Sequence, residues 1–198
     1  MSGLLDQPIT FDQLLSWDVR KHYDPEKIQR ILNKRQLTDA TVALALDVHA
    51  AIGACGSFWV IMREELLPAW LIHRMSVDLG RTVLDYAREH NAYIDFRTPQ
   101  LLDKKELWIE SALSLGDYRL AVRRAEEARM LVGELNDALA SGAADVICHI
   151  GREDARSAFR TAFELAKKIV QTPEFEHRII GDVRRRIAAV DNERLAAV

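Results

Sequence analysis

The sequence predicts an all-α fold, a single multi-helix bundle of about seven or eight helices over residues 1–198. Glycine and proline supply 9 and 5 of the 198 residues, whereas alanine and leucine together supply 49. This balance favours helices and weighs against sandwiches and phosphate-binding loops, which depend on turn residues. The length suits one domain, and an apolar share of 48% is typical of a folded globular chain.

Capping residues mark where the helices begin. Thr10 and Gln13 have the spacing of a capping box, which predicts a helix that runs to about Lys21. Proline at the first helical position removes no hydrogen bond that the helix needs, so a polar residue before proline predicts another start. The further starts are Asp24-Pro25, Thr38 or Asp39, Pro68 with a helix to about His90, Thr98-Pro99, Asp117 after Gly116, and Thr172-Pro173.

The segment 42–62 is a run of 21 mostly apolar residues, long enough to cross a bilayer. Asp47 and His49 lie inside it, and a carboxylate near the bilayer centre costs about 2.5–3.5 kcal/mol, so one buried central helix is preferred. A buried Asp47 needs a cation, and a structural ion pair is favoured over a pocket. Any pocket is expected at Asp47, His49 and His73. The candidate cations for Asp47 are the arginines that follow the segment, namely Arg63, Arg74, Arg81 and Arg88.

Small and apolar residues recur three and four residues apart after Gly116, which predicts a helix with a coiled-coil-like seam. The seam is the predicted interaction face, and its partner helix comes either from this chain or from another copy. The members of this seam are Tyr118, Ala121, Ala125, Ala128, Val132 and Leu135, continued by Leu139.

The stretch LGDY at 115–118, followed by Ala121 and Ala128, resembles the turn and second helix of a tetratricopeptide repeat. The preceding helix departs from that pattern at three positions, including Lys105, and the sequence contains no second copy. The resemblance implies an αα-hairpin around Gly116, without assignment to that family.

Two pairs of side chains have the spacing of metal ligands on one helical face. Asp145 and His149 lie four residues apart, and Glu174 and His177 lie three apart, the Glu-x-x-His spacing of di-iron bundles. The other ligands of such a site are not identifiable, and Glu174 also suits the first turn of a helix. A metal-dependent helical enzyme is therefore the alternative function, and no particular cofactor is predicted.

Arginines cluster near the C-terminal end of the sequence. On a helix they spread over more than one face, and acidic residues lie four positions before two of them, so a solvated, salt-bridged face is favoured over a phosphate track. The net charge of −3 gives no global attraction to nucleic acid. Nucleic-acid contact within a larger complex is the second alternative. The patch comprises Arg178, Arg184, Arg185 and Arg186.

The sequence contains no GxGxxG, GxxxxGK[ST], HExxH or GxSxG motif. It therefore lacks the motifs on which the common nucleotide-binding, zincin and α/β-hydrolase sites depend. Cys55 and Cys148 lie far apart without CxxC spacing, and the first residues carry no secretory signal, so a cytoplasmic chain is expected. We therefore expect a non-catalytic interaction or assembly subunit, acting as a homo-oligomer or with a protein partner and without a membrane.

Overall fold

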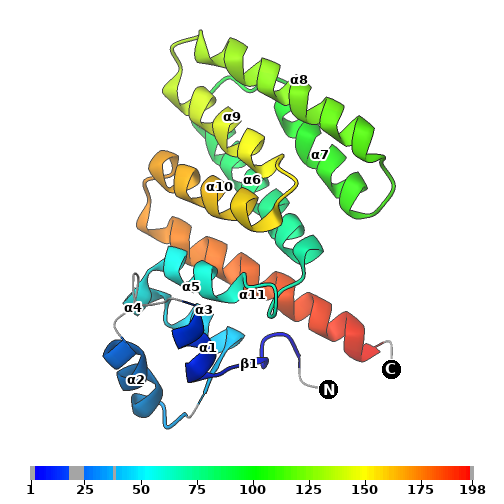
Figure 1. The fold of residues 1–198 in the computed structure, drawn as a ribbon. Coiled ribbons are helices and arrows are strands. Elements are labelled where there is room, and N and C mark those ends of the chain that lie inside the picture. Colours follow the sequence, from blue (N-terminus) through cyan, green and yellow to red (C-terminus); the bar gives the residue numbers. More distant parts are fainter. Residues whose placement is uncertain (1–2, 18–24, 38, 197–198) are drawn as a thin grey trace. The chain divides into compact units, whose positions relative to one another are not determined.

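The computed structural model describes residues 3–17, 25–37 and 39–196, and it confirms the all-α class (Figure 1). Contacts between Cα atoms divide the chain into two compact units. Unit 1 comprises residues 1–67 and 180–198, and unit 2 comprises residues 68–179. The helix α11 (Pro173–Ala196) contributes its first residues to unit 2 and the remainder to unit 1.

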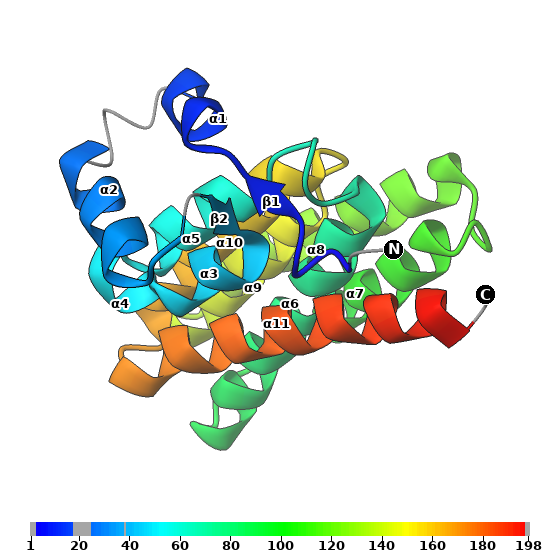
Figure 2. The same ribbon diagram turned by 90° about the horizontal axis from the view of Figure 1, so that it is seen from below.

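Unit 1 combines short helices with one small antiparallel ladder, in which Pro8 pairs with Thr41 and Ile9 with Ala40 (Figure 2). The Thr10 capping box is confirmed, because the Gln13 amide N–H donates to Thr10 Oγ1 at 3.1 Å and Gln13 Oε1 accepts from the Thr10 N–H at 2.9 Å. Helix α1 ends at Ser16, before the expected end at about Lys21, and Lys21 and Asp24 lie outside the described residues. The elements of unit 1 before residue 68 are β1 (Pro8–Ile9), α1 (Phe11–Ser16), α2 (Pro25–Lys34), β2 (Ala40–Thr41), α3 (Val42–Asp47), α4 (His49–Ile52) and α5 (Ala54–Ile61).

The expected single helix over 42–62 is wrong, because three short helices occupy that segment. Gly53 adopts φ 78° and ψ 152°, a backbone conformation that L side chains rarely adopt, and it separates α4 from α5. Thr41, rather than Thr38 or Asp39, caps α3 by accepting the Leu44 N–H at 3.1 Å, and Thr38 is outside the described residues. Among the described helices, each is too short or too polar to traverse a bilayer.

Unit 2 is built from consecutive helices that pack on their sequence neighbours. Helix α6 contacts α7, α9 and α10, while α8 contacts α7 and α9. Pro68 precedes the first of these helices, as expected. The helices are α6 (Ala69–Glu89), α7 (Arg97–Ile109), α8 (Leu115–Gly133), α9 (Ala138–Ile150) and α10 (Ala155–Ile169), followed by the start of α11.

Small residues let α9 contact α6, α7, α8 and α10. A Cβ on Gly142 would lie 3.0 Å from the Ile169 side chain of α10, so the absent side chain permits this close approach. Gly80 of α6 has the same role, since a Cβ there would lie 2.9 Å from Ile150 Cδ1 of α9. Gly80 and Gly142 therefore permit close helix packing in unit 2.

The αα-hairpin of α7 and α8 is present, but Gly116 is not its turn. Ser111 takes the left-handed conformation with φ 59°, and Ser114 caps α8 by accepting the Asp117 N–H at 3.1 Å. The expected cap at Asp117 is therefore wrong by three residues, because Gly116 already lies in the first helical turn. The seam is also shorter than expected, since α8 ends at Gly133 before Leu135.

Candidate functional site

A groove of about 200 Å³ runs between α7 and α8 in unit 2. Each helix contributes four side chains at offsets of zero, three, four and seven residues, which is one helical face. Two facing stripes therefore form its walls. The lining residues are Arg97, Gln100, Leu101 and Lys104 of α7, Leu113 of the connecting loop, and Asp117, Leu120, Ala121 and Arg124 of α8.

Arg97 is already neutralised by carboxylates. Its Nε and Nη2 donate to the two carboxylate oxygens of Asp95 at 2.9 and 2.8 Å, and Glu127 lies 3.9 Å from its Nη1. These hydrogen bonds hold the pKa of Asp95 below its usual value. Arg97 therefore closes one end of the groove without offering an unpaired charge.

Lys104 and Arg124 face the groove from opposite walls and are both exposed. Neither makes a hydrogen bond or ion pair with any residue that the structure describes. Asp117, the acid in the lining, accepts a hydrogen bond of 2.7 Å from the Ser114 hydroxyl at the start of α8. The groove consequently carries two uncompensated cations against one carboxylate.

Lys105, the neighbour of Lys104, is completely buried instead. Its Nζ donates to the carbonyl oxygens of Ile150 and, at 2.9 Å, Arg152. The carbonyls at the end of a helix carry partial negative charge, so Lys105 acts as a cap for α9. Burial lowers the pKa of Lys105 to about 7.

Two aromatic rings lie near the Lys105 ammonium. The rings of Trp108 and Tyr118 stack with centroids 4.6 Å apart, and the Lys105 Nζ lies 5.9 Å from each centroid. The imidazole ring of His73 lies edge-on to the Trp108 ring, with the ring centroids 5.1 Å apart. Burial, followed by the charge of Lys105, lowers the pKa of His73 to about 4, so this imidazole is neutral at pH 7.

We call His73, Lys105, Trp108 and Tyr118 the lysine cluster. Lys105 and Tyr118 hold the turn between α9 and α10, because the Tyr118 hydroxyl also donates to the Gly151 carbonyl at 2.6 Å, whereas the buried His73 Nδ1 has no hydrogen-bond partner among the described residues. His73, predicted as a pocket residue, is buried and does not line the groove. These hydrogen bonds indicate that the lysine cluster stabilises the turn between α9 and α10.

Lys105 is not among the site residues predicted from the sequence, although its position carries a signal. It lies four residues after Leu101 and three before Trp108, inside an apolar stripe. A lysine at such a position must find polar partners when the stripe is buried. Those partners lie 45 and 47 residues away, so their identity depended on the tertiary fold.

The predicted seam packs against helices of its own unit. Tyr118, Ala125, Ala128 and Val132 are buried, and α8 contacts α7 and α9. Ala121 lines the groove, whereas Leu135 lies beyond α8 and is 54% exposed. The side chains of α8 that face outward are different residues, namely Leu115, Leu120, Met130 and Leu131.

Asp47 and His49 both lie in unit 1. Asp47 pairs with Arg184 at 2.5 Å and lies 3.8 Å from Arg35, so its cations differ from the four arginines that the sequence suggested. Its carboxylate is 39% exposed rather than buried. The His49 Nδ1 lies 3.0 Å from the Leu46 carbonyl oxygen.

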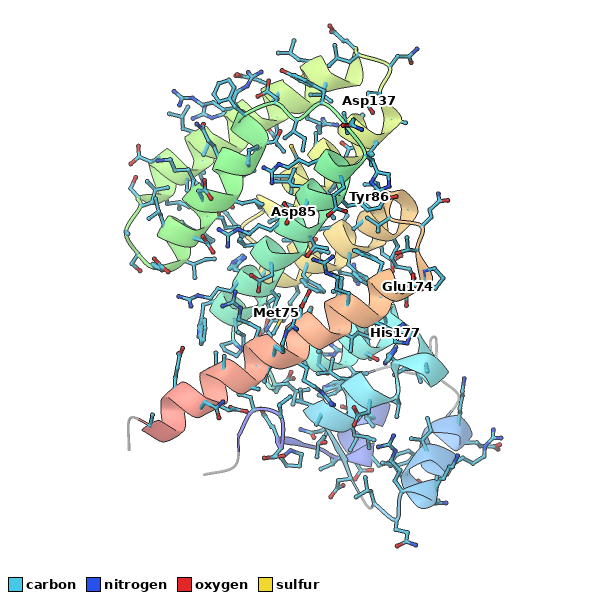
Figure 3. The ribbon with its side chains drawn as sticks, turned by 180° about the vertical axis from the view of Figure 1, so that it is seen from behind. Met75, Asp85, Tyr86, Asp137, Glu174 and His177 are labelled. Carbon is cyan, nitrogen blue, oxygen red and sulfur yellow. The ribbon has the colours of Figure 1, made fainter. Side chains whose placement is uncertain are left out.

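The two predicted metal pairs are not brought into one site. Asp145 accepts a hydrogen bond of 3.0 Å from Arg129, and burial lowers the pKa of His149 beside it on α9. Glu174 and His177 project from the exposed beginning of α11 (Figure 3). In the described parts of the chain, no group of three or more His, Cys, Asp or Glu residues could hold a metal ion.

The predicted basic patch is divided by ion pairs along α11. In unit 1, Arg184 donates to Asp47 and to the Ala43 carbonyl at 3.0 Å, and Arg185 pairs with Asp182. Arg178 is exposed in unit 2, whereas Arg186 is half-buried in unit 1. The paired arginines fit the salt-bridged face that the sequence favoured.

No protein-family model, curated protein or solved structure matches this chain.

Proposed function

We propose that this chain is a non-catalytic helical subunit that acts by binding another protein, a second copy of itself or a different chain, through the outward face of α8. The observation that carries the proposal is the exposure of large apolar side chains on a helix whose inner face is already buried. Met130 is 68% exposed, Leu131 53% and Leu120 40%. Met130 and Leu131 are neighbours in the sequence, and large apolar side chains such as methionine are typical of the cores of protein interfaces.

The energetics support this use of α8. Complete burial of a leucine or methionine side chain contributes about 1.5–3 kcal/mol, so covering Met130 and Leu131 would supply a substantial part of a binding free energy. Lys104 and Arg124 beside this face add charge that can orient a partner. The rest of a stable interface, about 1,000 Å² in total, would come from neighbouring surface.

The chemistry of the described side chains supports a binding role over a catalytic one. The Lys105 ammonium is bound by two carbonyl groups, and Asp47 is paired with arginines. Cys55 and Cys148 form no disulfide, which supports a cytoplasmic setting for the proposed subunit.

Native mass spectrometry of the chain, purified under mild conditions from its own host, tests the proposal. We expect a homo-oligomer or a stoichiometric complex with one protein, dissociated by the double substitution Met130→Glu and Leu131→Glu. Leu37→Glu, at a leucine 41% exposed in unit 1, is the matched control and should leave the complex intact. A monomer without a partner, unchanged by the double substitution, would overturn the proposal.

A further inference from the structure

We infer that the groove between α7 and α8 docks an acidic peptide segment of a partner protein, with an apolar side chain in the groove and carboxylates at Lys104 and Arg124. This inference rests on the proposed function and names the partner's chemistry. Met130 and Leu131 do not line the groove, whereas Leu120 belongs both to the exposed face of α8 and to the lining.

The size of the groove favours a side chain of a larger partner over a free small molecule. Its volume of about 200 Å³ lies below the roughly 300–1,000 Å³ of sites that enclose drug-sized ligands. Leu101, Leu113, Leu120 and Ala121 supply apolar lining, and alanine leaves room beside the larger leucines. One leucine-sized side chain can therefore be seated while the backbone that carries it remains at the surface.

The charge of the groove favours an acidic sequence around that side chain. Lys104 and Arg124 have no acidic partner among the described residues, whereas Arg97 is held by Asp95. With Asp117 counted as one negative charge, the remaining balance is +1, opposite in sign to the −3 of the whole chain. Carboxylates that flank a seated side chain would meet one cation on each wall, which fixes orientation as well as attraction.

A nucleic acid fits this groove less well. Single strands bind where aromatic side chains stack on the bases, and the lining contains no aromatic residue. Phosphate backbones also require several cations in succession, whereas the groove has two cations that lack a partner among the described residues. An apolar peptide side chain would cover the apolar lining of the groove, whereas a phosphate backbone would leave this lining exposed.

Fluorescence anisotropy with the full chain and three labelled nine-residue peptides tests the inference. The first peptide has a central leucine among aspartate and glutamate, the second replaces this leucine with serine, and the third replaces the acids with lysine. We expect saturable binding of the first peptide alone, weakened by added salt. Equal binding of the serine or lysine peptide would overturn the inference, as would no binding of the first peptide at millimolar protein concentration.

Substitutions in the groove locate the binding. Lys104→Glu with Arg124→Glu should weaken binding of the acidic peptide about tenfold or more, since losing 1.4 kcal/mol already corresponds to tenfold. Arg160→Glu with Arg156→Glu makes the same charge change on α10 and should leave the affinity within about twofold. Equal loss in both double variants would show attraction to the whole chain and would overturn the inference.

Ala121→Met provides a charge-neutral test because it fills the groove from α8. It should abolish binding while circular dichroism shows an unchanged helix content, and unchanged affinity would contradict docking in the groove. A labelled oligothymidine that binds more tightly than the acidic peptide, with the same dependence on Lys104 and Arg124, would overturn the peptide assignment. If the peptide fails while native complexes remain sensitive to Met130→Glu and Leu131→Glu, the groove inference alone is wrong.

Discussion

The hydroxyl of Tyr118 on α8 donates a hydrogen bond of 2.6 Å to the carbonyl oxygen of Gly151, 33 residues later in the chain. Lys105 on α7 donates to the carbonyls of Ile150 and Arg152, on either side of that glycine. Three successive carbonyl groups at the end of α9 are therefore satisfied by two side chains from the preceding hairpin. The hairpin and the α9–α10 turn are consequently linked by polar contacts as well as by packing.

Removing the Tyr118 hydroxyl should lower the free energy of unfolding. In Tyr118→Phe the ring remains while the buried Gly151 carbonyl loses its donor, which costs about 1–3 kcal/mol. Urea denaturation measures the change. Tyr93→Phe is the control, because the Tyr93 side chain is 55% exposed, and it should have no measurable effect. Equal stability of the two variants would contradict a structural role for the Tyr118 hydroxyl.

The stability of the chain should rise with pH through the lysine cluster. The pKa of His73 is lowered to about 4 from an ordinary 6.5, so between these values the unfolded chain binds a proton that the folded chain does not. Unfolding therefore becomes less favourable as pH rises from about 4 to 6.5. The pKa of Lys105, lowered to about 7 from 10.5, gives the same sign from about pH 7 to 10.5.

Chemical denaturation at a series of pH values checks this dependence. His73→Leu should flatten the rise between about pH 5 and 6.5, where aspartate and glutamate are largely ionised, and Lys105→Met should flatten the rise above about pH 7. His90→Leu is the control because His90 is exposed. An unaltered slope in both cluster variants would refute the linkage.

Two glycine substitutions in unit 2 should change stability in opposite directions. A Cβ on Gly80 would lie 2.9 Å from Leu102 Cδ2 and from Ile150 Cδ1, so Gly80→Ala should destabilise by about 1–3 kcal/mol through overpacking. A Cβ on Gly133 at the end of α8 would meet nothing within 4 Å, so Gly133→Ala should stabilise by up to about 1 kcal/mol. Thermal unfolding of the two variants measures the direction of each change in stability. A higher melting temperature for Gly80→Ala would show that α6 and its neighbours can move apart without loss of stability.

Asp191 should protect two amides of the N-terminal segment. Its carboxylate accepts hydrogen bonds from the backbone N–H groups of Leu4 at 2.7 Å and Leu5 at 3.2 Å. Asp191→Ala should therefore accelerate hydrogen exchange at these two amides and cost about 1–2 kcal/mol. Asn192→Ala, at the exposed neighbouring position, should leave their exchange rates unchanged. Unaltered protection in Asp191→Ala would show that these amides are held by other groups.

Local sequence signals predicted much of the fold because they act within one helical turn. The Thr10 capping box and Pro25 at the first position of α2 needed no tertiary information. Gly53 carried a local signal too, but the apolar residues around it favoured a continuous helix. The positive φ of Gly53 ends α4. Although the sequence has few glycines, this one therefore decides where two helices are divided.

The groove and the lysine cluster could not be predicted to the same extent, because both depend on contacts across helices. The periodicity of α8 correctly identified Tyr118 and Ala125 as one face, and it could not decide whether α7 and α9 or another copy would cover that face. Lys104 and Lys105 are adjacent in the sequence, yet one is exposed and the other fully buried. The position of Lys105 between Leu101 and Trp108 indicates its burial, whereas the carbonyl groups that bind it come from the end of α9 and could not be predicted.

The contact of Asp191 with Leu4 joins segments 187 residues apart, because unit 1 is assembled from two separate pieces of the chain. Residues 1–67 and 180–198 form unit 1, and residues 68–179, which lie between them in the sequence, form unit 2. Removal of residues 180–198 would therefore take Val183, Ile187 and Val190 from the core of unit 1 and leave the N-terminal segment without Asp191, whereas it would leave every residue of unit 2 in place.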